Sequence, residues 1–186
     1  MSEPNSLFAK IKIRKERLHH FLKSKPTNPQ LNENWLEWWN SKQMYGKKEL
    51  TQTDLRCYDF ATNEAIITDF VNDPRTYSFS DYDEESETWY FGIMLFTENY
   101  FEMIPGLALI QSISKFKEFD STDFAIIYNF FWEDDIIDVL MIFEKDHAIF
   151  DTRINAKADL NPDILLLCNT YLEKKLNEFE NNSSPS

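Results

Sequence analysis

Two almost continuous apolar segments, residues 123–132 and 136–144, limit what this chain can fold into more than any other feature of it. They flank a short acidic turn, Glu133-Asp134-Asp135. Apolar runs of this length between turn residues are typical of strands that are covered on both faces of a sheet. The sequence therefore predicts a hairpin at the centre of a sheet.

A second hairpin is predicted upstream of the first. Residues 76–82 and 88–97 are rich in aromatic and β-branched side chains, and they flank the acidic turn 83–87. A fifth short strand near residues 147–152 would extend the sheet. Because each turn joins neighbouring segments, we expect a mainly antiparallel sheet.

Helices are expected before these strands. Residues 7–23 have apolar side chains at helical spacing among many cations, which predicts a basic amphipathic helix. A second helix is expected from Asn28-Pro29, because Asn is a good N-cap and Pro is tolerated at the first helical position. It carries a stripe of three indoles that we expect to be buried, those of Trp35, Trp38 and Trp39.

Three further helical segments are indicated. One covers residues 62–72, and one begins at Asn161-Pro162 with an apolar face that continues to Phe179. The segment 100–119 is ambiguous, because Pro105-Gly106 divides it and helical spacing is seen only after that point.

The expected fold class is α+β, with a mainly antiparallel sheet of about five strands and N- and C-terminal helices packed on one face of it. We expect residues 1–186 to form a single domain, with residues 1–48 as a basic helical N-terminal segment and residues 181–186 as a disordered tail. The only candidate subdomain boundary is the loop Tyr45-Gly46-Lys47-Lys48.

Charge is sorted along the chain. Residues 1–48 hold 10 Lys and Arg against 4 Asp and Glu, whereas residues 49–153 hold 6 against 23. An acidic body repels nucleic acid and anionic membranes and accelerates encounter with a cationic protein. The basic segment can lie across this acidic body, in its own chain or in a second subunit of a homodimer.

The usual signatures of catalysis and cofactor binding do not occur. The three glycines are isolated, so neither a phosphate-binding loop nor a dinucleotide fingerprint can be written. His19 and His20 are adjacent and point in different directions on a helix, which disfavours a shared metal ion. Cys57 and Cys168 lie among apolar neighbours, which favours buried, reduced thiols. We therefore expect no catalytic residues, no metal and no cofactor.

The two acidic turns are the candidate partner-binding site. If both turns lie at one end of the sheet, their carboxylates and the neighbouring aromatic rings form one patch that suits a basic protein. Its residues are Asp81, Tyr82, Asp83, Glu84, Glu85, Glu87 and Trp89 in the first hairpin, and Trp132, Glu133, Asp134 and Asp135 in the second. Acidic hairpin turns also keep a sheet soluble, which is the alternative interpretation.

Two other functional classes stay open. The chain can be an adaptor or regulatory subunit that acts through its basic N-terminal helix, or an enzyme that uses paired carboxylates. The N-terminal segment has no uninterrupted apolar run, and no apolar run approaches the length of a transmembrane helix. We therefore expect a cytoplasmic protein that does not enter a membrane.

With its acidic turns 81–87 and 133–135, its aromatic content and its lack of catalytic motifs, the chain resembles the immunity proteins that neutralise bacterial polymorphic toxins. The resemblance implies a small cytosolic inhibitor that blocks the active cleft of a toxin domain. It also implies that carboxylates of the inhibitor meet the Lys and Arg side chains that a toxin such as a nuclease uses for its substrate.

Overall fold

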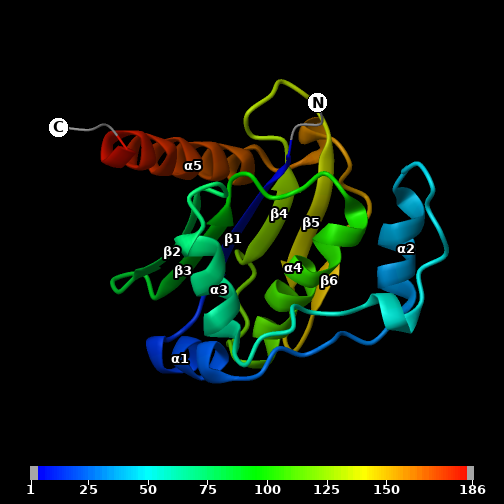
Figure 1. Ribbon diagram of the computed structural model, residues 1–186, viewed down its shortest axis with the longest axis horizontal. Coiled ribbons are helices and arrows are strands. Elements are labelled where there is room, and N and C mark those ends of the chain that lie inside the picture. Colours follow the sequence, from blue (N-terminus) through cyan, green and yellow to red (C-terminus); the bar gives the residue numbers. More distant parts are fainter. Residues whose placement is uncertain (1–3, 184–186) are drawn as a thin grey trace.

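The computed structural model describes residues 4–183, excluding the side chain of Ser183, and its centre is an antiparallel sheet of six strands. The strand order is β2-β3-β1-β4-β5-β6 (Figure 1). The strands are β1 (Ser6–Lys12), β2 (Ser78–Asp83), β3 (Thr88–Ile93), β4 (Phe124–Tyr128), β5 (Ile137–Phe143) and β6 (Ala148–Phe150). The two hairpins that the sequence predicts are β2–β3 and β4–β5, and β6 is the predicted extra strand.

Helices cover both faces of the sheet (Figure 1). They are α1 (Lys15–Lys23), α2 (Glu33–Ser41), α3 (Asn63–Asn72), α4 (Tyr100–Ser112) and α5 (Pro162–Ser183), with short 3-10 helices at Gln52–Asp54, Ile113–Lys115 and Lys157–Asp159. The α+β class is confirmed. Among residues 4–183, no helix combines the length and the apolar character that crossing a membrane requires.

The first strand, β1, corrects the prediction of a helix over residues 7–23. Residues 6–12 form a central strand between β3 and β4, and only Lys15–Lys23 are helical. Leu7, Ala9 and Ile11 point to one face of the sheet at a period of two, and all three are fully buried. Part of the predicted basic helical segment 1–48, residues 6–12, is therefore a central strand of the sheet.

The larger core lies between the sheet and α1 to α4. The tryptophan stripe of α2 is buried there, as predicted, and Trp35 and Trp38 both pack against the ring of Phe150. The Asn34 side chain also exchanges two hydrogen bonds with the Phe150 backbone, of 2.8 and 2.9 Å. Residues before and after the Tyr45–Lys48 loop thus pack in one core. Helix α2 packs against β6, the edge strand of the sheet.

Helix α5 covers the opposite face, so the terminal helices do not share one face as expected. Cys168 and Leu172 on α5 are fully buried against Phe8 and its neighbours on the sheet. Of the predicted tail 181–186, residues 181–183 continue α5, and residues 184–186 lie outside the described part of the chain. The ambiguous segment 100–119 forms α4 with Pro105 inside it, followed by a 3-10 turn.

Candidate functional site

The two acidic turns lie at opposite ends of the sheet, which corrects the prediction of one continuous patch. Strand β1 pairs Lys12 with Thr88, so the turn of β2–β3 lies at the Lys12 end of β1. Strand β1 also pairs Ser6 with Tyr128, so the turn of β4–β5 lies at the Ser6 end. Figure 1 shows the same separation.

In the β2–β3 hairpin, cations of the chain itself lie against the acidic residues. Lys15 of α1 forms an ion pair with Glu84, and Lys175 of α5 lies 3.1 Å from the Asp81 carboxylate. Tyr171 also donates a hydrogen bond of 2.9 Å to Asp81. Asp83 accepts hydrogen bonds from Ser86 and from the Glu85 backbone N–H, which lower its pKa. Two carboxylates of this hairpin, those of Asp81 and Glu84, are thus paired with cations of the chain itself.

The two candidate aromatic residues of this hairpin make their contacts within the chain itself. Trp89 is only 1% exposed, stacks on Phe91 and donates a hydrogen bond from Nε1 to Ser80. Tyr82 is half-buried, and its hydroxyl donates to the Ile13 carbonyl at 3.0 Å. Trp89 is therefore a core residue, and the prediction that it belongs to a binding surface is wrong.

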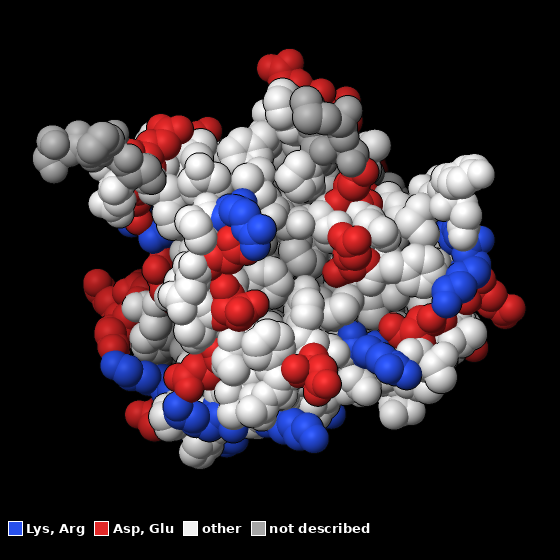
Figure 2. Space-filling view, viewed as in Figure 1, with Lys and Arg blue, Asp and Glu red and all other residues white. Residues whose placement is uncertain are grey.

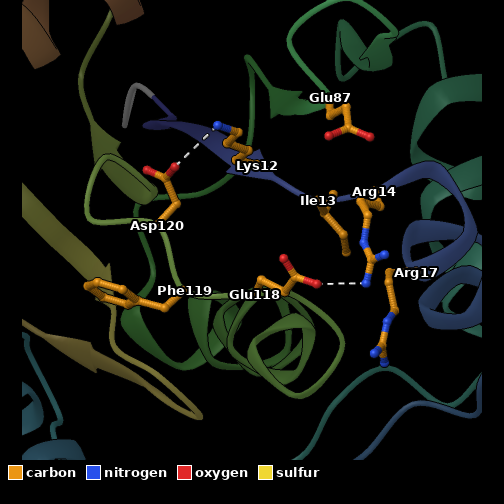
Figure 3. A pocket seen from close by; sticks show the side chains of 8 residues that line it. All are labelled: Lys12, Ile13, Arg14, Arg17, Glu87, Glu118, Phe119 and Asp120. Carbon is orange, nitrogen blue, oxygen red and sulfur yellow. Dashed lines mark hydrogen bonds and ion pairs between the residues drawn. The ribbon is translucent and has the colours of Figure 1, made fainter.

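A small cleft beside this hairpin shows which acids pair with cations of the basic segment (Figure 3). The cleft measures about 150 Å³, and Lys12 and Arg14 on one side of it face Asp120 and Glu118 on the other, at 3.7 and 2.6 Å. Lys12 and Arg14 of the basic segment therefore pair with acids of their own chain. The segment does not lie across the acidic body as a helix, because residues 6–12 are a strand within the sheet.

The turn between β4 and β5, residues 129–136, has the opposite character, and we call it the acidic loop. Trp132 is 48% exposed and Ile136 is 55% exposed, although both are large apolar side chains. Phe130 and Phe131 precede them, are half-buried, and pack on each other at 5.1 Å between ring centroids. The acidic loop therefore offers apolar area to a partner beside its three carboxylates.

The backbone of the acidic loop is held by several hydrogen bonds. The Asn129 side chain accepts from the Trp132 N–H at 3.1 Å, and the Asp134 side chain accepts from the Ile136 N–H at 2.7 Å. The Asp135 carbonyl accepts from the Lys157 N–H, also at 2.7 Å. Side chains that close such turns restrict the backbone, so the loop presents its exposed residues in a defined arrangement.

The carboxylates of the acidic loop have no ion-pair partner in the described part of the chain, although the Lys157 ammonium lies 3.5 Å from the Asn129 carbonyl of the loop. Of the ion pairs within residues 4–183, none involves Glu133, Asp134 or Asp135. In Figure 2, acidic side chains are spread over the visible face, including its top, and Lys and Arg side chains lie mostly toward the lower and right-hand parts of it.

Helix α5 is joined to the strand that leads into this loop. Tyr128, the last residue of β4, donates a hydrogen bond of 2.7 Å to Asn169 of α5. Leu166 of the same helix is an exposed apolar side chain, at 67% exposed.

Behind the acidic loop is a buried polar cluster that the sequence analysis did not single out. Strand β5 has a β-bulge: Ile127 of β4 pairs with Val139 and Tyr128 pairs with Ile137, which leaves Asp138 between them without a partner on β4. Asp138 is only 6% exposed. A lone acid inside the apolar run of residues 136–144 is the sequence signal that could have identified it.

Four side chains from other elements surround Asp138. Its carboxylate accepts hydrogen bonds from Asn5 at 2.6 Å and Tyr100 at 2.7 Å, and its backbone carbonyl accepts one from Trp38 at 3.1 Å. Lys42, which is 8% exposed, attracts it electrostatically. Burial raises the pKa of Asp138, and burial lowers the pKa of Lys42.

A second buried acid, Asp123, lies at the other end of the sheet. It is paired with Lys117 at 2.8 Å, and both side chains are almost inaccessible to solvent. Asp123 also accepts a hydrogen bond of 2.7 Å from the Lys12 backbone N–H. Burial raises the pKa of Asp123, and Lys117 opposes that change. This pair joins β4 to the end of β1.

The remaining candidate chemistry is metal binding and thiol reactivity. Within residues 4–183, no group of three His, Cys, Asp or Glu side chains is arranged to hold a metal ion. Cys57 and Cys168 are free thiols; Cys168 is buried as predicted, whereas Cys57 is only half-buried. Partial burial raises the pKa of Cys57 to about 11. At that pKa, very little of the reactive thiolate is present at neutral pH.

The chain was compared with models of protein families, with curated proteins and with solved structures, and it matches none of them.

Proposed function

We propose that this chain is a non-enzymatic acidic binding protein that neutralises a basic protein partner. The observation that carries the proposal is the acidic loop, where three carboxylates without ion-pair partners lie beside the exposed side chains of Trp132 and Ile136. A hot spot of this kind combines an aromatic anchor with charges that guide association.

The partner that fits this surface is a protein with Lys and Arg side chains around an apolar pocket. Its cations would approach the carboxylates first, because their attraction acts over about 10 Å at moderate ionic strength. Its apolar pocket would then bury the indole of Trp132. A cationic cleft that binds an anionic substrate has this chemistry, so occupation by the acidic loop would inhibit the partner.

The biological setting that agrees best with this activity is that of a bacterial toxin immunity protein in the cytoplasm. Such a protein acts by covering the toxin, so its own chain needs neither catalytic residues nor a cofactor. The proposed binding surface is the acidic loop alone and not both turns, because Trp89 is buried and Glu84 already forms an ion pair with Lys15.

An adaptor that acts through its basic N-terminal helix is the second candidate. The observation that favours it is the exposure of Arg17, His19 and His20 on α1. However, Lys15 and Lys23 of the same helix form ion pairs with Glu84 and Glu64. Deletion of residues 1–25 cannot test this candidate, because it would remove the central strand β1.

The experiment that tests the proposal is affinity capture from a lysate of the source organism at low and high salt, followed by mass spectrometry. The bait is the full-length protein in three forms: native, Glu133→Lys with Asp135→Lys, and Glu85→Lys with Glu87→Lys. The first double variant keeps the Asp134 side chain that closes the loop. The second is a matched control with the same change of charge in the other turn.

The proposal predicts one basic protein that the native and control baits recover and the loop variant does not. Recovery that is equal with all three baits would contradict it. Loss after Arg17→Glu with His20→Glu, with retention by the loop variant, would favour the adaptor instead.

A further inference from the structure

The pairing of β4 with β5 is irregular where the two strands enter the acidic loop. The β-bulge lies between Ile127 and Tyr128, and the last pair of the ladder is Tyr128 with Ile137. The Ile137 N–H donates to the Asn155 carbonyl at 3.0 Å, outside the β4–β5 pair. Because a bulge locally disrupts the ladder, the two strands alone hold the base of the loop less firmly than a regular hairpin does.

A later part of the chain, residues 155–157, makes contacts with the second half of the loop. Ile136 forms an antiparallel bridge with Ala156. The next residue, Lys157, donates a hydrogen bond of 2.7 Å from its backbone N–H to the Asp135 carbonyl. This short segment therefore supports the loop at the side that leads into β5.

The side chain of Lys157 reaches the other side of the loop. Its Nζ lies 3.5 Å from the carbonyl oxygen of Asn129, the first residue of the loop, and 5.8 Å from the centroid of the Tyr128 ring. The face of an aromatic ring attracts a cation at this distance. The side chain is half-buried, so it is held between the two sides and does not extend into solvent. One residue thus contacts both ends of the acidic loop.

We propose that Lys157 is a positioning residue for the acidic loop: its backbone N–H and its ammonium group bind the two ends of the loop and hold Trp132 and the carboxylates in the arrangement that receives the basic partner. The role in binding rests on the proposed function. The effect on the loop is a property of the free protein and can be measured without a partner.

The charge of Lys157 and its contacts have opposite consequences. As a cation beside an acidic surface, it repels a basic partner, so removal of the charge alone would strengthen binding. A more negative local potential also repels hydroxide, which would slow amide exchange in the loop. Loss of positioning would weaken binding and accelerate exchange. The sign of each effect therefore separates the two roles.

The test is hydrogen exchange of residues 129–137 in the free full-length protein at pH 7, followed by mass spectrometry. Lys157→Met removes the ammonium group and keeps the backbone N–H, so exchange should accelerate about twofold. Lys157→Pro also removes the N–H that binds Asp135, so exchange should accelerate about tenfold. Proline suits this position, because Lys157 begins a 3-10 helix and Ala156 before it is extended, with φ −132° and ψ 153°.

Two further variants are controls. Lys157→Arg keeps both a cation and the N–H, so the loop should exchange as in the native protein. Arg153→Met makes the same change of charge nearby, but Arg153 is paired with Asp151 and its side chain is 84% exposed, so exchange of the loop should not accelerate. Protection of β1 should be the same in all variants, which separates the loop from the stability of the whole fold.

The proposal is overturned if the loop in Lys157→Pro exchanges as in the native protein, if Arg153→Met accelerates it equally, or if β1 loses protection to the same extent. If Lys157→Pro does not fold, unchanged or slower exchange in Lys157→Met overturns it.

The capture experiment tests the role in binding separately. Lys157→Met should recover less of the basic partner than the native bait does, and greater recovery would show that only the charge of Lys157 matters. Failure of the native bait to capture a basic protein would reject the proposed function and leave the exchange measurements unaffected. Normal capture with an unaltered loop would reject only the role of Lys157.

Discussion

The β2–β3 turn and the acidic loop look alike in sequence and differ in the structure. Both are acidic, and both are flanked by aromatic residues. At the first turn, Lys15 and Lys175 neutralise carboxylates and Trp89 is in the core. At the acidic loop, the carboxylates have no ion-pair partner among the described residues and Trp132 is half-exposed. The comparison teaches that an acidic turn is a candidate for a binding surface only where the rest of the chain leaves its charges and rings without partners.

The largest expected difference concerns the two tryptophans. Trp89→Ala should lower the free energy of unfolding by about 3 to 5 kcal/mol, because it removes a large buried ring and leaves a cavity. Trp132→Ala should change it by less than about 0.5 kcal/mol, because its ring is partly in solvent. Urea unfolding followed by circular dichroism measures both. A large loss of stability in Trp132→Ala would show that this ring is structural after all.

Charge reversal should separate the turns during association. With a purified partner, Glu133→Lys with Asp135→Lys should lower the association rate constant about 100-fold at low salt and reduce its dependence on ionic strength. Glu85→Lys with Glu87→Lys should lower it less than about threefold, because longer-range attraction is screened. Stopped-flow measurements at several salt concentrations test this, and similar slopes for both variants would remove the distinction between the turns.

Removal of the aromatic anchor should weaken the complex in a different way. Trp132→Ala should increase the dissociation constant about 30-fold, mainly through faster dissociation, as buried aromatic anchors do. Surface plasmon resonance separates the two rate constants. An unchanged dissociation rate would mean that the partner contacts only the carboxylates.

The polar cluster around Asp138, behind the acidic loop, should make the stability of the protein depend on pH. The folded pKa of Asp138 is raised by burial, so the folded state binds its proton more tightly than the unfolded state does. Its contribution to stability is therefore present at low pH and is lost as the pH rises through the folded pKa. Urea unfolding between pH 4 and 7.5 should show a smaller loss with rising pH in Asp138→Asn than in the native protein. An equal loss would mean that Asp138 does not titrate in this range.

The smallest effect is expected from the ion pair of the β2–β3 turn. Lys15 and Glu84 are both well exposed, and exposed pairs contribute about 0 to 1 kcal/mol. Lys15→Met should therefore change the free energy of unfolding by less than about 0.5 kcal/mol. If Lys15→Met also binds a partner through the β2–β3 turn, the ion pair with Lys15 of α1 is what prevents this turn from binding in the native protein.

Most of the sheet could be predicted from sequence because its strands have clear local signals. The apolar runs on either side of Glu133 indicate β4 and β5, and the aromatic segments around residues 83–87 indicate β2 and β3. The tryptophan stripe and the Asn161-Pro162 start also identified α2 and α5. In each case a period, a turn or a cap specified the element without reference to distant residues.

Strand β1 was missed because two signals compete in the same residues. Leu7, Ala9, Ile11 and Ile13 alternate with a period of two, yet Lys10 and Lys12 between them gave the segment the look of a basic amphipathic helix. Lys10 instead reaches the Thr122 hydroxyl at 2.8 Å, and Lys12 reaches Asp120. Long cationic side chains can leave a buried strand in this way, so charge alone does not exclude one.

The geometry of the candidate binding surface could be predicted only in part, since strand order decides which turns meet. Trp132, Glu133 and Asp135 are exposed and Asp134 is half-buried, and their role in binding stays a prediction. Whether they join residues 81–89 depends on β1 lying between the hairpins, which no local pattern specifies. The bulge at Asp138 likewise arises from pairing between β4 and β5.

The central place of β1 has a consequence for how the protein is made. This strand is synthesised before both of its neighbours, residues 88–93 and 124–128. A nascent chain shorter than about residue 128 therefore carries Leu7, Phe8 and Ile11 without the strands that cover them. Contacts between such distant segments form slowly, and unpaired apolar strands are prone to aggregate. Translation must therefore pass β4 before the middle of the sheet can close around β1.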